Sequence, residues 1–150
     1  MSNKPSLASV LLVDDSHYDV VLTKVLLERD KVMMNLISVG DGREAMSYIE
    51  QEPPFEDAPL PDLMLLDLNM PDINGFEVLK LMAYKDLLKQ IPVIICSGSD
   101  SDQDMNTSLS FGAADYLVKP LDYEKLAPVI ARLPGLSLSD AEGQHFIYKA

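Results

Sequence analysis

The sequence predicts an α/β domain in which a parallel sheet of five strands is covered by helices on both faces. Five short apolar runs alternate with five segments of helical periodicity. Right-handed crossovers between parallel strands then place helices on both faces of one sheet. Polar residues stand directly at the ends of four of these runs. A length of 150 residues is enough for one domain with a substantial core.

The order of the elements follows from the apolar runs and the turn residues between them. The strands are predicted at residues 7–13, 33–39, 63–67, 91–96 and 115–118. The helices are predicted at residues 17–29, 42–49, 75–84, 102–111 and 121–133. Ser16 and Asp122 are the expected N-caps of the first and last helices, and Gly112 should end the fourth as a C-cap. Pro128 falls inside the last helix and should kink it or remove a hydrogen bond.

Two segments do not follow this alternation. Residues 50–61 hold four prolines and four acidic residues, which indicates an exposed, irregular connection. The predicted boundaries are an N-terminal extension at 1–6, the α/β domain at 7–133 and a C-terminal tail at 134–150. The tail ends in an apolar cluster around Ile147. Two alternatives stay open for it, docking onto the domain through that cluster or mobility.

Composition narrows the classes of function. The chain has 24 Asp and Glu residues against 12 Lys and Arg, a formal net charge of -12, which argues against direct binding of nucleic acid. The single cysteine, Cys96, excludes an intramolecular disulfide, and its apolar surroundings indicate a buried structural thiol. The first residues lack the apolar core of a signal peptide, and no run approaches the length of a membrane span. We therefore expect a cytoplasmic protein without a membrane partner.

Chemically capable residues gather at the ends of the predicted strands. Asp14 and Asp15 follow the first strand, Asp67 ends the third, Ser97 the fourth and Lys119 the fifth. The carboxyl ends of parallel strands share one edge of the sheet, so these side chains should converge there. Three carboxylates repel one another unless a cation lies between them, and Mg²⁺ prefers such oxygen ligands. With a lysine and a hydroxyl added, the set suits phosphoryl transfer onto Asp67. For Asp67 taken alone, the simpler alternative is a cap for the next helix.

Four motifs give the sequence a resemblance to a known family. They are Leu-Leu-Val-Asp-Asp at 11–15, Leu-Leu-Asp-Leu-Asn-Met-Pro at 65–71 with the later Asn-Gly, the strand ending at Ser97, and Asp-Tyr-Leu-Val-Lys-Pro at 115–120. With them the chain resembles the receiver domains of bacterial two-component response regulators over about residues 7–133. The resemblance implies a flavodoxin-like fold with strand order 2-1-3-4-5 and five helices on both faces. The proline-rich insertion is similar to that of single-domain receivers paired with phytochrome-like kinases.

The resemblance also implies roles for individual residues. Asp67 would accept the phosphoryl group from a sensor kinase's phosphohistidine. Asp15 would bind Mg²⁺ directly and Asp14 through water, with Asp67 and the backbone carbonyl of Asn69 completing the protein ligands.

Three further positions follow from the same resemblance. Lys119 would pair with a phosphoryl oxygen, and Ser97 would hydrogen-bond another phosphoryl oxygen after transfer. Tyr116 would swing inward as the site closes. The bond between Lys119 and Pro120 is similar to the cis peptide of the family.

The leading hypothesis is therefore a stand-alone phosphorylation switch rather than an enzyme, although it assists its own phosphorylation and dephosphorylation. Its partners would be a sensor histidine kinase or phosphotransfer protein and an unknown downstream protein. If the chain forms a homodimer, the predicted surface is the fourth helix, fifth strand and fifth helix. No segment after residue 133 is long enough for a DNA-binding domain.

Three other functions compete with the switch. A phosphatase of the haloacid dehalogenase type would need an aspartate where Asn69 stands. A flavodoxin-like cofactor carrier would need a phosphate loop where Asp14 and Asp15 stand, and these carboxylates would repel a phosphate. The third alternative is a receiver-like binding module that is never phosphorylated.

Overall fold

The central sheet of the computed structural model, which describes residues 5–150, has five parallel strands in the order β3-β1-β4-β5-β6. The strands are β1 (Ser9–Val13), β3 (Asn35–Val39), β4 (Leu63–Asp67), β5 (Val93–Ser97) and β6 (Asp115–Val118). Numbered along this sheet alone, the order is 2-1-3-4-5, the flavodoxin-like arrangement. The predicted fold class is therefore confirmed. In the register, Val13 lies beside Val39 and Leu66, so the carboxyl ends of neighbouring strands are level.

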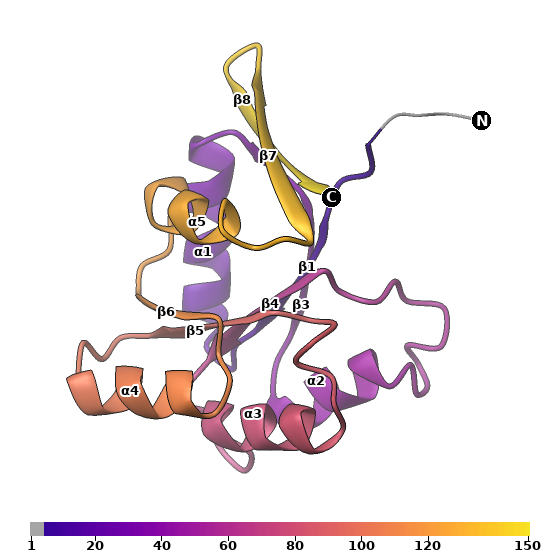
Figure 1. Ribbon diagram of the computed structural model, residues 1–150, viewed down its shortest axis with the longest axis vertical. Coiled ribbons are helices and arrows are strands. Elements are labelled where there is room, and N and C mark those ends of the chain that lie inside the picture. The colour runs from indigo at the N-terminus through magenta and orange to yellow at the C-terminus, as the bar shows by residue number, and fades with distance from the viewer. Residues whose placement is uncertain (1–4) are drawn as a thin grey trace.

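Helices cover both faces of the sheet (Figure 1). One face carries α1 (His17–Arg29) and α5 (Tyr123–Ile130), and the other carries α2 (Gly42–Ile49), α3 (Gly75–Tyr84) and α4 (Asp102–Ser110). Each face has its own buried apolar cluster, and alternate residues of the strands point into one cluster or the other.

Polar side chains start every one of these helices. In each case the side-chain oxygen of the N-cap accepts a hydrogen bond from a backbone N–H of the first helical turn. The N-caps are Ser16, Asp41, Asn74, Ser101 and Asp122. Gly112, with φ of 103°, adopts the left-handed conformation expected just after α4. The caps and the C-cap glycine that the sequence indicates are thus confirmed.

The predicted strand at 33–39 is divided between two sheets. Val32 and Met33 form β2 (Val32–Met33), which pairs with β8 (Gln144–Lys149) in a second sheet that also contains β7 (Leu136–Ala141), in the order β2-β8-β7. Asn35–Val39 form β3 and pair with β1. The prediction of one continuous strand over residues 33–39 was therefore wrong. The local pattern is compatible with one strand, but the C-terminal segment offers β2 a partner 113 residues away in the chain, in the registers Val32 with His145 and Met33 with Phe146.

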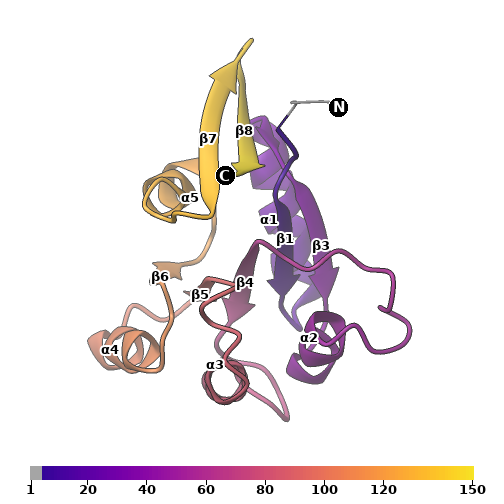
Figure 2. The same ribbon diagram turned by 45° about the vertical axis from the view of Figure 1, so that its right-hand side comes forward.

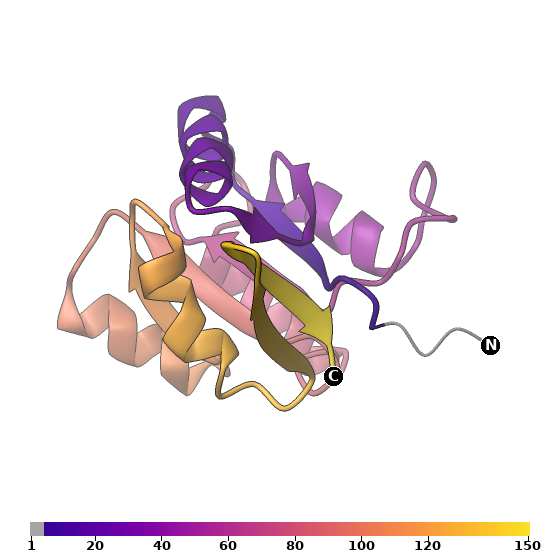
Figure 3. The same ribbon diagram turned by 90° about the horizontal axis from the view of Figure 1, so that it is seen from above.

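The C-terminal segment forms a hairpin of β7 (Leu136–Ala141) and β8 (Gln144–Lys149). The two turn residues, Glu142 and Gly143, both have positive φ, which suits a tight two-residue hairpin. Figures 2 and 3 show this hairpin beside α5 on the face of the sheet that carries α1. The segment is therefore docked in this structure.

Two buried residues attach the hairpin to the domain. Ile147 is fully buried and Leu136 nearly so, and both belong to the apolar cluster beneath α1 and α5. The carbonyl oxygen of Ile147 also accepts a hydrogen bond of 2.8 Å from the N–H of Ala8. α5 contains Pro128, which has no N–H to donate, and the helix ends at Ile130 rather than at residue 133. The hairpin that follows α5 packs against the same apolar cluster as the helix.

Three smaller expectations concern the remaining chain. Residues 1–4 of the predicted N-terminal extension lie outside the described residues, and the boundaries at 7–133 and 134–150 stay predictions. Cys96 is buried in the core, as expected. Within residues 5–150, no helix combines the length and apolar character needed to cross a membrane.

Candidate functional site

The site begins where β1 ends, at Asp14. Its Oδ1 atom accepts a hydrogen bond of 2.9 Å from the backbone N–H of Ser16, which turns the carboxylate toward the carboxyl edge of the sheet. Ser16 in turn caps α1 by accepting the N–H of Asp19. Asp14 is buried, whereas the next residue, Asp15, is exposed. One short turn therefore places one carboxylate in the sheet edge and one at its surface.

The second strand end places Asp67 beside them. Asp67 is the last residue of β4, is 5% exposed and lies opposite Cys96 of β5. The chain then returns so closely that the N–H of Gly75 donates to the carbonyl of Leu68 at 2.9 Å. A Cβ atom on Gly75 would lie 2.6 Å from the carbonyl oxygen of Asp67. Only glycine fits there without a shift, and this close packing holds the loop after Asp67 in place.

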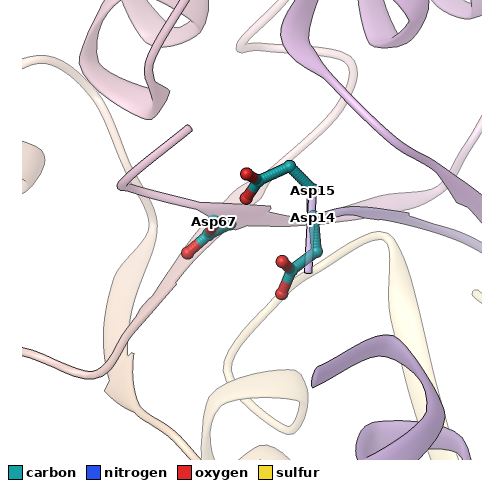
Figure 4. Close-up of side chains that lie close together, drawn as sticks. All are labelled: Asp14, Asp15 and Asp67. Atoms are coloured by element: carbon teal, nitrogen blue, oxygen red, sulfur yellow. The ribbon is translucent and has the colours of Figure 1, made fainter. Parts of the chain in front are cut away.

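The three carboxylates form a group of potential metal ligands. One oxygen from each of Asp14, Asp15 and Asp67 lies within 4.8 Å of the others. Figure 4 shows the side chains of Asp14 and Asp15 leaving the chain in different directions, with Asp67 next to them on β4. Carboxylate oxygens are the ligands that Mg²⁺ and other hard divalent cations take, so the residues present fit such an ion.

Lys119 connects the carboxylates from the end of β6. Its Nζ atom donates to Oδ2 of Asp14 at 2.9 Å, Oδ2 of Asp19 at 2.9 Å and Oδ1 of Asp67 at 3.1 Å. Its backbone N–H donates to the carbonyl of Ser97, which fixes the residue beside β5. The peptide bond from Lys119 to Pro120 is cis, as the resemblance implied.

Burial and the contacts between Lys119 and the carboxylates act in opposite directions on the pKa values of Asp67 and Lys119. Burial, reinforced by the neighbouring charge of Asp14, raises the pKa of Asp67 to about 6, although Lys119 counteracts this. Burial alone would lower the pKa of Lys119, but the hydrogen bonds that its amine donates to Asp19 and Asp14 and the charge of Asp67 more than offset it, so this pKa is raised. Lys119 therefore stays protonated, and it lies beside the carboxyl group of Asp67, whose ionisation is disfavoured by burial.

Two of the remaining predicted site residues, Ser97 and Tyr116, lie in β5 and β6. Ser97 is fully buried, and its Oγ accepts a hydrogen bond of 3.1 Å from the N–H of Ser99. Tyr116 is 7% exposed, and its hydroxyl donates to the carbonyl of Ser99 at 2.8 Å. The tyrosine ring is already buried in this structure. The inward movement of Tyr116 on phosphorylation stays a prediction. The side chain of Asn69 is exposed in the loop after β4, and the role of its carbonyl also stays a prediction.

Sequence reasoning missed Asp19, the third carboxylate on Lys119. In the pattern Ser16-x-x-Asp19, Asp19 is an acidic residue in the first turn of a capped helix. Aspartate is common at such positions because it interacts favourably with the helix dipole, so the pattern does not indicate a functional role. The signal that could have found it is the direction of that turn. The first turn of a helix that follows an acidic strand end directly must lie at the same sheet edge.

Comparison with known proteins decides the family. The model of the response regulator receiver domain matches residues 10–131. The chain belongs to this family. Receiver domains are signalling proteins that take a phosphoryl group from histidine kinases or phosphotransfer proteins, and they bind Mg²⁺ or Mn²⁺ at an acidic pocket.

Individual relatives agree with this assignment. The receiver is 34% identical over 129 residues to response regulator Rcp1 of Synechocystis sp., covering 86% of each chain. It is 31% identical over 124 residues to protein PilH of Pseudomonas aeruginosa, covering 83% of this chain and 95% of PilH.

Solved structures extend the likeness to the fold. The bacteriophytochrome response regulator RtBRR matches with a TM-score of 0.76 and 35% identity, covering 91% of this chain and 82% of that one. The Mn²⁺-bound form of Rcp1 matches with a TM-score of 0.68 and 34% identity, covering 78% of this receiver and 84% of that chain. The similarity to phytochrome-associated regulators that the sequence indicated is thereby confirmed.

Proposed function

We propose that this receiver accepts a phosphoryl group on Asp67 and changes conformation to control a partner protein. The observation that carries the proposal is the convergence of Asp14, Asp15 and Asp67 with the amine of Lys119 at one sheet edge. A static binding module would gain nothing from this arrangement, because buried carboxylates around one lysine cost desolvation free energy.

The chemistry follows from the placement of these groups. A carboxylate oxygen of Asp67 forms a bond to phosphorus while the bond from phosphorus to the donor's leaving group breaks and the leaving group departs with the electron pair. Lys119 already donates to Asp67 Oδ1, so its amine stands where charge on a transferred phosphoryl group would develop. The hydroxyl of Ser97, at the end of the adjacent strand, is available to donate to another phosphoryl oxygen.

The acidic residues would hold Mg²⁺, which neutralises phosphoryl charge when bound. Asp14, Asp15 and Asp67 supply side-chain oxygens, and we assign the backbone carbonyl of Asn69 as a further ligand. Without such an ion, the three carboxylates and Asp19 carry four negative charges against the one positive charge of Lys119. That imbalance disfavours the approach of an anionic phosphodonor.

Incubation with acetyl phosphate, with and without Mg²⁺, tests the proposal when it is followed by intact-mass measurement. We expect the addition of one phosphoryl group that requires Mg²⁺ and is absent from Asp67→Asn. An unmodified mass under both conditions would refute phosphorylation and favour the static binding module. A modification that persists in Asp67→Asn would place the acceptor elsewhere.

We further propose that a sensor histidine kinase or phosphotransfer protein is the physiological donor, and that the receiver acts in the cytoplasm. A homodimer would use α4, β6 and α5. Leu109 of α4 exposes 47% of its surface there, and Arg132, just after α5, pairs with Asp115 of β6. Light scattering with Arg132→Glu tests the dimer, and an unchanged mass distribution would exclude this surface.

A further inference from the structure

The ammonium group of Lys119 has no N–H left over in this structure. Lysine offers three donors, and the three acceptors within hydrogen-bond distance are carboxylates of Asp14, Asp19 and Asp67. Asp14 and Asp67 stand at strand ends, but Asp19 approaches from α1. The lysine is therefore held from two sides, by the sheet edge and by a helix.

Each acceptor has a different relation to the reaction. A phosphoryl group on Asp67 would replace one acceptor by a phosphoryl oxygen in nearly the same direction. Asp14 belongs to the group of carboxylates that fits a metal ion. Asp19 belongs to neither group, and its side chain is 31% exposed, compared with 3% for Asp14 and 7% for Asp67.

We propose that Asp19 is a positioning residue that acts through Lys119, an inference that rests on Asp67 being the phosphoacceptor. By holding one N–H, Asp19 restricts the rotation of the long lysine side chain, so that another N–H stays directed at Asp67. The entropy of ordering the amine is then lost on folding rather than in the transition state.

The local structure supports a role beyond helix capping. The start of α1 is satisfied without the Asp19 carboxylate, because Ser16 caps through the backbone N–H of Asp19 and Thr23 donates to its backbone carbonyl. A cavity of about 180 Å³ lies beside the ion pair, lined by Asp19, Leu22, Thr23, Lys119 and Pro120. Without Asp19, the amine would have open space to enter on that side.

The chain contains a matched control in α4. Asp104 occupies the same place after its cap Ser101 that Asp19 occupies after Ser16, and its backbone carbonyl accepts the hydroxyl of Ser108, as that of Asp19 accepts Thr23. Unlike Asp19, Asp104 makes no ion pair among residues 5–150. Substitution of Asp104 therefore reproduces the helix effect of Asp19 without its contact to Lys119.

The test compares phosphorylation by acetyl phosphate in saturating Mg²⁺. We expect Asp19→Ala to lower the rate constant at saturating donor by about tenfold, with the half-saturating donor concentration changed by less than about twofold. Asp19→Asn keeps an acceptor oxygen for the amine and should restore the rate to within about threefold of wild type. Asp104→Ala should leave the rate constant within about twofold. Equal rates for the two alanine variants, or a faster Asp19→Ala variant, would overturn the inference.

A second measurement separates this inference from the proposed function. Urea unfolding of Asp19→Ala, Lys119→Met and the double variant gives a coupling that does not depend on phosphorylation. We expect the coupling between Asp19 and Lys119 to correspond to about a tenfold factor in the unfolding equilibrium constant. In the control cycle, with Asp104→Ala in place of Asp19→Ala, the factor should be less than about twofold. Absence of coupling would overturn the positioning role even in a receiver that is phosphorylated. A wild-type receiver that takes up no phosphoryl group would overturn the proposed function and, with it, this inference.

Discussion

The raised pKa of Asp67 makes the stability of the protein depend on pH in a direction that can be measured. Its carboxyl group has a pKa of about 6 in the folded protein, compared with its usual value of 3.8. A group that binds its proton more tightly in the folded state favours folding while it is protonated. That contribution is complete below about pH 4 and is lost as the pH rises toward 6.

The size of the effect follows from the same interval. About two pH units correspond to about 3 kcal/mol of unfolding free energy that the ionised carboxylate costs at neutral pH. Asp67→Asn removes the charge and keeps an acceptor for Lys119, which still has Asp14 and Asp19 as ionised partners. The raised pKa already includes the attraction of Lys119, so the expected gain in stability is at most about 3 kcal/mol at pH 8.

Urea unfolding followed by far-ultraviolet circular dichroism from pH 4 to pH 8, in the presence of a chelator, measures this difference. We expect Asp67→Asn to equal wild type near pH 4 and to exceed it increasingly up to pH 6. Asp57→Asn, a change at an exposed carboxylate in the 50–61 connection, is the control and should follow wild type throughout. A variant that is less stable than wild type at pH 8, or a difference independent of pH, would refute the reasoning.

Three further substitutions test the packing. Ile147→Ala should lower the free energy of unfolding by about 2–5 kcal/mol, because Ile147 is fully buried between the hairpin and the domain; a loss below about 1 kcal/mol would mean that the hairpin is not docked in solution. Tyr48→Phe should keep the contact with Phe55 and remove a buried hydroxyl that has no partner among residues 5–150. The thermal unfolding temperature should therefore rise or stay unchanged. A decrease of several degrees would indicate that a bound water satisfies the hydroxyl. Gly75→Ala should cost about 1–3 kcal/mol and slow phosphorylation by acetyl phosphate, since its Cβ would press on the carbonyl of Asp67; wild-type behaviour in both assays would show that the loop can move aside.

The sequence was sufficient for the features that depend on local patterns. Apolar runs of strand length located all five strands of the central sheet, and the residue at the end of each run identified Asp14, Asp67, Ser97 and Lys119 as neighbours. This works because parallel strands bring their carboxyl ends to one edge whatever the loops between them do. The helix caps at Ser16 and Asp122 are equally local, since a cap bonds to an N–H only a few residues away.

The tertiary structure alone decided the features that depend on distant partners. Residues 33–39 have the pattern of one strand, yet they are divided because β8 supplies a second partner from the far end of the chain. The tail was compatible with docking or mobility until Ile147 was found in the core. Asp19 resembles any acid at the start of a helix, and only the folded arrangement, in which the start of α1 and the end of β6 meet at one sheet edge, brings its carboxylate within 2.9 Å of the Lys119 amine. Long-range pairing of this kind is set by the free energy of the whole fold, which no local window of sequence contains.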